Sequence, residues 1–232
     1  MTYTKHLSAL LIAVAMATSA LAQQHRSVLE LNGQGEHLLI LSHPDFNIPP
    51  DGSYTISLHL SGDRTIIYNT GQRLVSRRDL KAPKGSNQSG YELLGLRNLT
   101  KAFFGVSTPD STGGYDHSLN VWTGDEALRR ELHTWHHVAW VVDRTQHRML
   151  LYIDGQLQRK GQSPDIGSWS MEQNLPILIG AAQEGERRVA FYGGKLDNIR
   201  FYRRALSPSE IREDSRTERI SHKAEGLVAA YE

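Results

Sequence analysis

The chain has 232 residues, and its 26 lysines and arginines almost balance its 25 aspartates and glutamates, for a formal net charge of +1. This balance does not favour nucleic acid or an anionic membrane as a partner. The chain contains no cysteine, which excludes disulfides, thiolate zinc sites and cysteine-based catalysis.

Residues 1–22 have the pattern of a secretory signal peptide. An apolar run over residues 7–21 ends in Ala20-Leu21-Ala22, a small-x-small cleavage site. The alternative interpretation is a retained N-terminal anchor. Cleavage predicts a mature chain of about 210 residues that begins at Gln23, which fits one domain. A domain of this size needs no disulfide staples, so the absence of cysteine fits export to a compartment where disulfides are optional. We expect secretion to a bacterial periplasm, cell surface or extracellular space.

Short strand-like segments separated by turns fill the first half of the chain. The clearest, residues 54–60, alternates apolar and polar side chains with the period of two that a half-buried strand requires. The motif Asn32-Gly33-Gln34-Gly35 predicts a hairpin between the first two segments. The segments in this half are residues 27–31, 37–41, 54–60, 66–76, 91–96, 102–107 and 118–122.

The second half continues this pattern and adds one helix. Residues 137–143 and 149–153 form apolar runs, and Asp154-Gly155 predicts a tight hairpin turn after the second. Ser207, Pro208 and Glu210 have the spacing of an N-cap, a first helical proline and a capping box, so a short helix is expected up to residue 214 or 215. The remaining strand-like segments are residues 156–160, 176–180, 195–202 and 226–231.

About a dozen short strands and one short helix predict an all-β domain of two packed antiparallel sheets, or a barrel. We place this domain at residues 23–215. Residues 216–232 are a polar linker and a terminal strand, which either closes the domain or starts a further region.

Several segments together resemble the bacterial laminin-G-like, concanavalin A-like domain over residues 27–214. The resemblance lies in three motifs that occur in order, each with the family's spacing. They are Leu29-Glu30-Leu31-Asn32-Gly33, then Trp135-His136-His137-Val138-Ala139 with Leu151-Tyr152-Ile153-Asp154-Gly155, and Gly194-Lys195-Leu196-Asp197-Asn198-Ile199-Arg200-Phe201-Tyr202 with Arg204-Ala205-Leu206-Ser207.

The resemblance implies a jelly roll of two curved antiparallel sheets, of the kind attached to secreted sialidases and glycoside hydrolases. It also implies a structural calcium ion between the opening turn and the Asp of the last motif. The matching residues are Asn32 and Asp197, with Gly33 and Glu36 as helpers. The family more often has aspartate at the position of Asn32, so this chain has one charge fewer for the ion.

A glycan is the expected ligand. Sugar rings bind to aromatic side chains through their apolar C–H faces and to polar side chains through their hydroxyl groups. The alternative is that the aromatic residues fill the core, as Trp140 is expected to do. The candidate ligand-binding residues near predicted loops are Arg77, Tyr91, Tyr115, Asp116, His117, Asn120, Trp122 and Tyr192.

No catalytic residues are predicted. Glycoside hydrolysis requires two carboxyl groups about 5–10 Å apart on rigid elements, and the Glu-x-Asp-x-x-Glu run of the superfold's enzymes does not occur in the sequence. His136 and His137 point to opposite faces of a strand and are expected to be structural. The sequence therefore predicts a carbohydrate-binding module, with a covalently linked catalytic domain as a possible partner. The alternatives are a protein-adhesion module without a sugar site, a fragment of a larger glycoside hydrolase, and a cryptic enzyme of the superfold.

Overall fold

The computed structural model describes residues 28–62, 71–82, 89–96, 99–106, 117–122 and 134–232. The predicted signal peptide, Tyr115 and Asp116 lie outside these residues. No helix in the described part of the chain is long and apolar enough to span a membrane.

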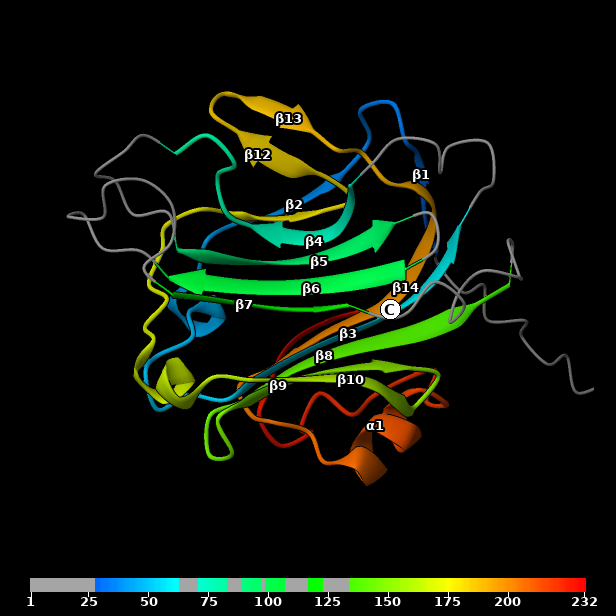
Figure 1. Ribbon diagram of the computed structural model, residues 1–232. Coiled ribbons are helices and arrows are strands. Elements are labelled where there is room, and N and C mark those ends of the chain that lie inside the picture. Colours follow the sequence, from blue (N-terminus) through cyan, green and yellow to red (C-terminus); the bar gives the residue numbers. More distant parts are fainter. Residues whose placement is uncertain (1–27, 63–70, 83–88, 97–98, 107–116, 123–133) are drawn as a thin grey trace, which may run out of the picture.

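Two antiparallel sheets stack face to face (Figure 1), which confirms the predicted sandwich. The seven-stranded sheet has the order β1 (Leu29–Asn32), β14 (Gly193–Tyr202), β3 (Tyr54–Gly62), β8 (His136–Asp143), β9 (Arg148–Ile153) and β10 (Gln156–Gln162), with β15 (Leu227–Tyr231) also paired to β14. The six-stranded sheet has the order β2 (Leu38–Ile40), β11 (Ile177–Ile179), β4 (Gln72–Arg77), β5 (Gly90–Leu96), β6 (Leu99–Val106) and β7 (His117–Trp122). A separate hairpin joins β12 (Ala182–Glu184) to β13 (Arg187–Val189).

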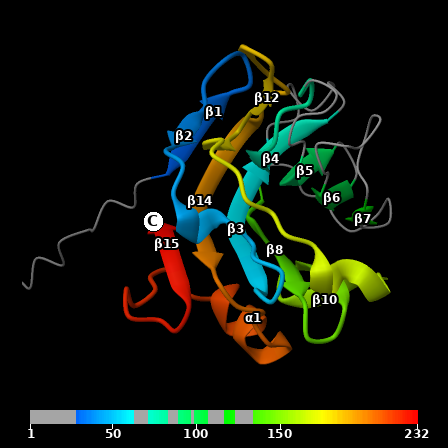
Figure 2. The same cartoon turned by 90° about the vertical axis from the view of Figure 1, so that its left-hand side faces the viewer.

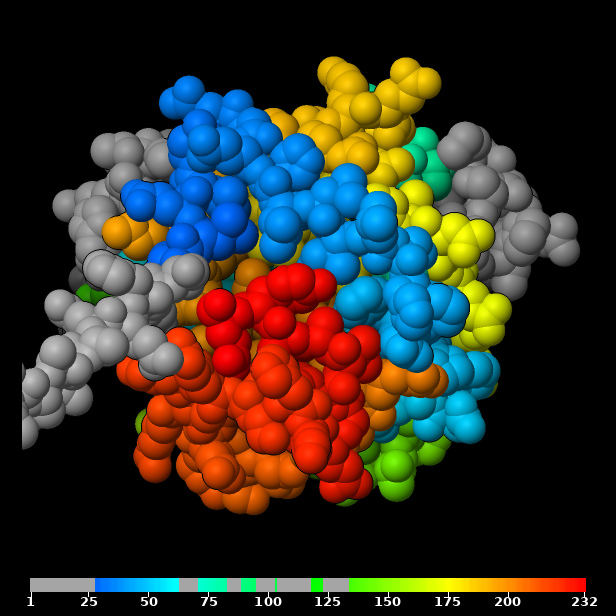
Figure 3. Space-filling model, turned by 180° about the vertical axis from the view of Figure 1, so that it is seen from behind, coloured from blue at the N-terminus to red at the C-terminus, as the bar shows by residue number. Residues whose placement is uncertain are grey.

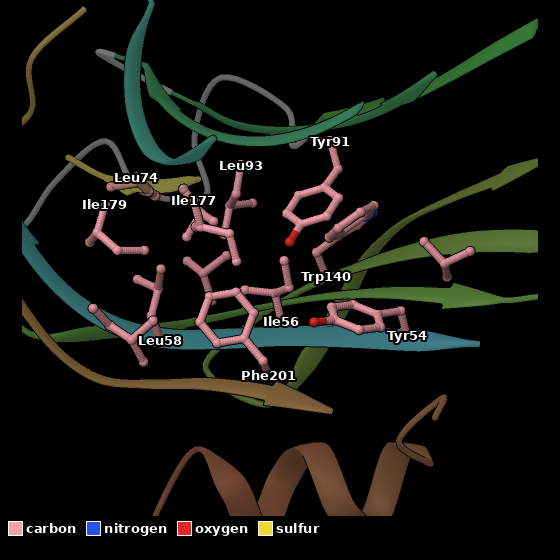
Figure 4. Packing of buried hydrophobic residues seen from close by; sticks show 14 of the residues in the cluster. Tyr54, Ile56, Leu58, Leu74, Tyr91, Leu93, Trp140, Ile177, Ile179 and Phe201 are labelled. Carbon is pink, nitrogen blue, oxygen red and sulfur yellow. The ribbon is translucent and has the colours of Figure 1, made fainter. Parts of the chain in front are cut away.

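The core lies between the two sheets (Figure 4). Trp140 of β8 is completely buried beside Tyr91 of β5, with their ring centroids 5.6 Å apart. Alternate residues of β3, such as Ile56 and Leu58, point into the same layer. Each fully buried side chain of this size contributes about 1.5–3 kcal/mol to stability, so the alternating pattern in the sequence fixes which face of each strand is inside.

The predicted hairpin around Asn32-Gly33-Gln34-Gly35 is wrong. β1 pairs with β14 and β2 pairs with β11, so the two strands belong to different sheets. Gly33 and Gly35 have φ angles of 71° and 142°, which glycine adopts at little cost. The turn therefore carries the chain across the sandwich instead of reversing it within one sheet.

The single α-helix, α1 (Pro208–Asp214), begins as predicted. The Ser207 hydroxyl accepts a hydrogen bond from the Glu210 N–H, and the Glu210 carboxylate accepts one from the Ser207 N–H at 2.7 Å. Ile211 packs on the outer side of the seven-stranded sheet, in a small apolar cluster with Val141 and Tyr152. The helix therefore covers the face of this sheet that points away from the core.

A buried polar cluster fixes the end of α1 to the sheet. The Asp214 carboxylate accepts hydrogen bonds from Tyr202 and Arg200 at 3.0 and 2.8 Å, and its other oxygen lies 3.0 Å from His137 Nε2. The His59 ring lies 5.0 Å from the His137 ring. Burial, followed by the charge of His137, lowers the pKa of His59, so His59 is neutral at pH 7 and serves as a structural group.

The edge of the seven-stranded sheet is built from both ends of the described chain. β1 pairs with residues 193–196 of β14, and β15 pairs with residues 199–202 on the same edge and in the same direction. Val28 and Glu232 line one hollow of about 490 Å³ between the two strands. Figures 2 and 3 show β15 lying on the surface beside the N-terminal strands. One edge strand is thus divided between two distant parts of the sequence.

Candidate functional site

The outer face of the six-stranded sheet carries an unusual set of side chains. Strand register places two rows across it, because residues paired between strands share a face. One row includes Arg73, Leu94 and Trp122, and the other is Ser76, Glu92, Phe103 and Asn120. We call the outward side chains of Arg73, Ser76, Glu92, Leu94, Phe103, Asn120 and Trp122 the β4–β7 face.

Glu92 is the centre of this face on β5. Its side chain is only 2% exposed, and it pairs with Arg73 Nε at 2.9 Å and Arg78 Nη1 at 3.2 Å. The Ser76 hydroxyl donates to the same carboxylate at 3.3 Å. A buried carboxylate requires such partners, because an unpaired one would lose its hydration without compensation. The two guanidinium groups are therefore held in fixed positions on the sheet.

Arg78 is held on its second side by an aromatic ring. Its guanidinium carbon lies 4.6 Å from the centroid of the Phe103 ring, which is within range of a cation–π interaction. Gly90 provides the space for this arrangement, since a Cβ at this position would lie 2.5 Å from the Arg78 Cβ and 2.4 Å from the Arg77 carbonyl oxygen. Arg78 therefore depends on a neighbouring strand for its placement.

The face becomes more open towards β7. Asn120 is half-buried, and its Oδ1 is buried without a hydrogen-bond partner. Trp122, two residues further along the strand, is 54% exposed. An unpaired buried acceptor carries a cost that a bound donor would remove. Asn120 and Trp122 thus combine a free acceptor with an exposed aromatic ring.

β10 of the other sheet borders β7 at this edge. Arg159 Nε donates to the Trp122 carbonyl oxygen at 3.2 Å. Gly161 allows the two strands to approach, because a Cβ there would lie 2.8 Å from Val121. Trp122 therefore stands where the edges of the two sheets meet.

The structure corrects three of the predicted ligand-binding residues. Arg77 and Tyr91 are fully buried and Tyr192 is 3% exposed, so a ligand outside the sandwich cannot reach them. Arg77 donates to the carbonyl oxygens of Leu175 and Gln173. Burial raises the pKa of the Tyr91 hydroxyl, which stays neutral.

The other predicted residues have different outcomes. Asn120 and Trp122 lie together on the β4–β7 face. His117 is the first residue of β7, and its side chain lies outside the described residues, as do Tyr115 and Asp116. Arg73, Arg78, Glu92 and Phe103 were missed. The sequence held a signal for Arg78 and Glu92. Each directly follows a predicted residue, Arg77 or Tyr91, and it is the following residue that faces outward.

The four residues predicted to hold calcium do not form one ligand set. Asn32 pairs with Gly193, four residues before Asp197 on β14, which is a separation of about 13 Å along the strand. Glu36 Oε2 accepts a hydrogen bond from the Asn32 N–H, and Asn32 Oδ1 accepts one from the Gln34 N–H. Both oxygens therefore bind backbone N–H groups within the turn of residues 32–36. No cluster of three histidine or acidic residues suited to a metal occurs in the described part of the chain. Calcium binding stays a prediction, and it would need ligands other than this set.

Comparison with known proteins identifies the family. The family model described as "Concanavalin A-like lectin/glucanases superfamily" matches residues 32–212. The chain belongs to this family. Its laminin-G-like resemblance is thereby confirmed, and the match covers the six-stranded sheet, most strands of the seven-stranded sheet and most of α1. A search of curated proteins finds no match.

Solved structures share this concanavalin A-like fold at low identity. The CBM40 module of a Ruminococcus gnavus IT-sialidase, solved with α2,3-sialyllactose, is 14% identical with a TM-score of 0.60, over 82% of this chain and 97% of that one. The NanB sialidase of Streptococcus pneumoniae is 15% identical with a TM-score of 0.58, over 80% of this chain and 27% of that one. Mouse laminin α1 domains LG4-5 are 18% identical with a TM-score of 0.50, over 78% and 46%. The chain spans 41% of the botulinum neurotoxin serotype G binding domain, another similar structure.

Proposed function

We propose that this chain is a secreted, non-catalytic carbohydrate-binding module of a glycan-degrading protein, and that the β4–β7 face is its sugar site. The observation that carries the proposal is the exposed Trp122 ring beside the unpaired Oδ1 of Asn120. An aromatic platform next to a fixed polar group matches the two surfaces of a sugar, its C–H face and its hydroxyl edge. The sialidase-attached module of similar fold that was solved with sialyllactose supports this function.

The single described carboxylate of the β4–β7 face supports binding rather than hydrolysis. Glu92 is the one acidic residue among the described side chains of this face, and two arginines and a serine use both of its oxygens. A glycosidase needs a second carboxyl group within about 10 Å and one member free to exchange a proton. We therefore assign Glu92 the role of positioning the arginines.

The test is a glycan array followed by calorimetry on the mature chain, residues 23–232. We expect binding to at least one oligosaccharide, and Trp122→Ala should weaken it about two- to twelvefold, as the loss of a contact of roughly 0.5–1.5 kcal/mol predicts. The matched control is Leu41→Ala, which removes a 77% exposed apolar side chain after β2 on the other edge of the same sheet. This variant should bind like the unchanged chain.

Two results would contradict the proposal. One is an array without any binding, which would favour the alternative of a protein-adhesion module. The other is equal weakening by both substitutions, which would place the sugar away from Trp122. Hydrolysis of a bound glycan by the isolated chain, abolished by Glu92→Gln, would overturn the non-catalytic assignment.

A further inference from the structure

The edge strands of the two sheets meet on one side of the sandwich. β7 ends the six-stranded sheet and β10 ends the seven-stranded one, and Figure 2 shows both on the side away from β1 and β15. Over their described lengths the two strands do not pair through their backbones, so β7 keeps carbonyl groups on its outer edge. Arg159 of β10 donates from Nε to one of them, the Trp122 carbonyl oxygen, at 3.2 Å. A side chain of one sheet therefore lies beside the exposed tryptophan of the other.

A β-bulge in β10 turns Arg159 towards β7. The register of β10 against β9 shifts by one residue between Leu157 and Arg159. As a result Arg159 pairs with Leu151, whose side chain belongs to the core between the sheets. In an unshifted register it would pair with Leu150, which lies in the apolar cluster beneath α1. Because directly paired residues share a face, the bulge moves Arg159 from the side that α1 covers to the side that meets β7.

The guanidinium group of Arg159 has donors available to a ligand. The side chain is exposed, and among the described residues the bond from Nε is its only polar contact. Arg159 differs in this respect from Arg73 and Arg78, which both pair with Glu92. The N–H groups on Nη1 and Nη2 form the planar fork with which arginine binds two neighbouring acceptors. The Nε bond holds one side of this fork at the edge of β7.

Three kinds of contact come together at this edge. Trp122 presents an exposed ring, Asn120 presents an acceptor without a partner, and Arg159 presents donors. Asn120 and Trp122 are two residues apart on one face of β7, a separation of about 7 Å. A hydroxyl group both donates and accepts hydrogen bonds. A sugar can therefore use the acceptor of Asn120 and the donors of Arg159 while its C–H face lies on the tryptophan ring.

We propose that Arg159 binds the glycan directly, and that the bound chain extends over the edge of β7 from Asn120 to β10. This inference rests on the proposed function and adds a contact from the second sheet. The ligand class is an oligosaccharide with neighbouring hydroxyl groups, whose oxygens accept from Nη1 and Nη2. An oligosaccharide suits the site better than a single sugar, since the contacts extend along β7 and then across to a strand of the other sheet.

The experiment measures binding of the mature chain, residues 23–232, to a glycan array that includes lactose, cellotriose and 3′-sialyllactose. The apparent Kd of every glycan that binds is then compared between variants. Arg159→Ala should weaken binding about two- to twelvefold, as the loss of one hydrogen bond predicts. Arg159→Lys should weaken it by a similar factor, because the charge stays but the planar fork is lost.

The matched control is Lys160→Ala. Lys160 is the next residue of β10 and is also an exposed cation, but it pairs with Leu150 and so faces the other side of the sheet. This variant should bind like the unchanged chain. Thermal unfolding of each variant checks that the substitution leaves the fold intact, and Arg159→Lys, which keeps the long side chain, supplies the readout if Arg159→Ala does not fold.

A double-mutant cycle separates contact with the glycan from support of Trp122. If Arg159 binds the glycan itself, Arg159→Ala weakens binding by a similar factor in the unchanged chain and in Trp122→Ala. If Arg159 only holds the Trp122 carbonyl group in place, the substitution has no further effect once the ring is removed. We expect the first result.

The outcomes separate the inference from the function on which it rests. Unchanged binding by Arg159→Ala, together with weaker binding by Trp122→Ala, overturns the inference and keeps the sugar-binding function. An effect of Arg159→Ala that disappears in Trp122→Ala also overturns it. Full binding by Arg159→Lys would overturn the recognition of neighbouring hydroxyl groups, because charge alone would then suffice. Absence of binding to every glycan removes both the inference and the function.

Discussion

Asp214 shows how one residue decides the position of a helix. Burial by itself would raise the pKa of this carboxyl group, but its hydrogen bond with His137, together with the charges of His137 and Arg200, lowers the pKa well below the usual value. The charged form is therefore the one that the folded protein stabilises. Arg200 is completely buried beside it, so removal of the carboxylate would leave a buried cation with fewer partners.

Asp214→Asn should lower the free energy of unfolding by about 3–5 kcal/mol at pH 7, the usual cost of breaking a buried ion pair. Because the folded pKa is lower than the unfolded value of 3.8, the contribution of Asp214 is complete above that value and declines as pH falls below it. The difference between the two proteins in urea unfolding should therefore shrink from pH 7 to pH 3. Glu213→Gln, at the exposed neighbouring position, is the control. A difference that stays constant with pH would contradict the linkage.

At the scale of the elements, the sequence predicts strands and turns well. The strand before Asp154-Gly155, the tight turn itself, with φ angles of 50° and 74°, and the capping box of α1 all occur as expected. Each depends on neighbouring residues in the chain. The predicted hairpin at Asn32 is wrong because the sheets that β1 and β2 join depend on contacts with β14 and β11. These partner strands are more than 130 residues away in the sequence.

The candidate site could be predicted only in part for a related reason. A shift of one residue moves every side chain of a strand to the opposite face. The sequence placed Arg77 and Tyr91 outside, whereas the register puts Arg78 and Glu92 there. Asn120 and Trp122 were selected because they lie near a loop, and their shared face with Phe103 and Arg73 follows from pairing across four strands. No local pattern contains that information.

Gly90 offers a test of the four-strand arrangement. In Gly90→Ala the new methyl group would meet the Arg77 carbonyl and the Arg78 Cβ at 2.4 and 2.5 Å, so Arg78 has to move. We expect a loss of stability of about 1–3 kcal/mol, as for other overpacked positions. Thermal unfolding would measure this loss. A folded variant with unchanged stability would show that Arg78 is not held from β5.

At the scale of the whole molecule, β15 protects an otherwise open edge. Val228, Ala229 and Tyr231 pack against the main core, and Glu232 pairs with the buried Arg200 at 3.1 Å. A chain that ends at Glu225 would expose the backbone of β14 over residues 199–202, and unpaired edge strands associate readily. The shortened chain should unfold at a lower temperature and form oligomers in light scattering. A peptide of residues 226–232 should reverse both effects, and a stable monomeric truncated chain would contradict this role.

The divided edge strand also governs how such a domain can be combined with others. A polypeptide that enters at Val28 and leaves at Glu232 enters and leaves at a single point on the surface, since both residues line the same hollow. Domains with adjacent ends can be inserted into a surface loop of a host protein with little entropic cost, because they hardly change the span that the loop must close. The fold is therefore suited to being carried within another chain, and not only at its end.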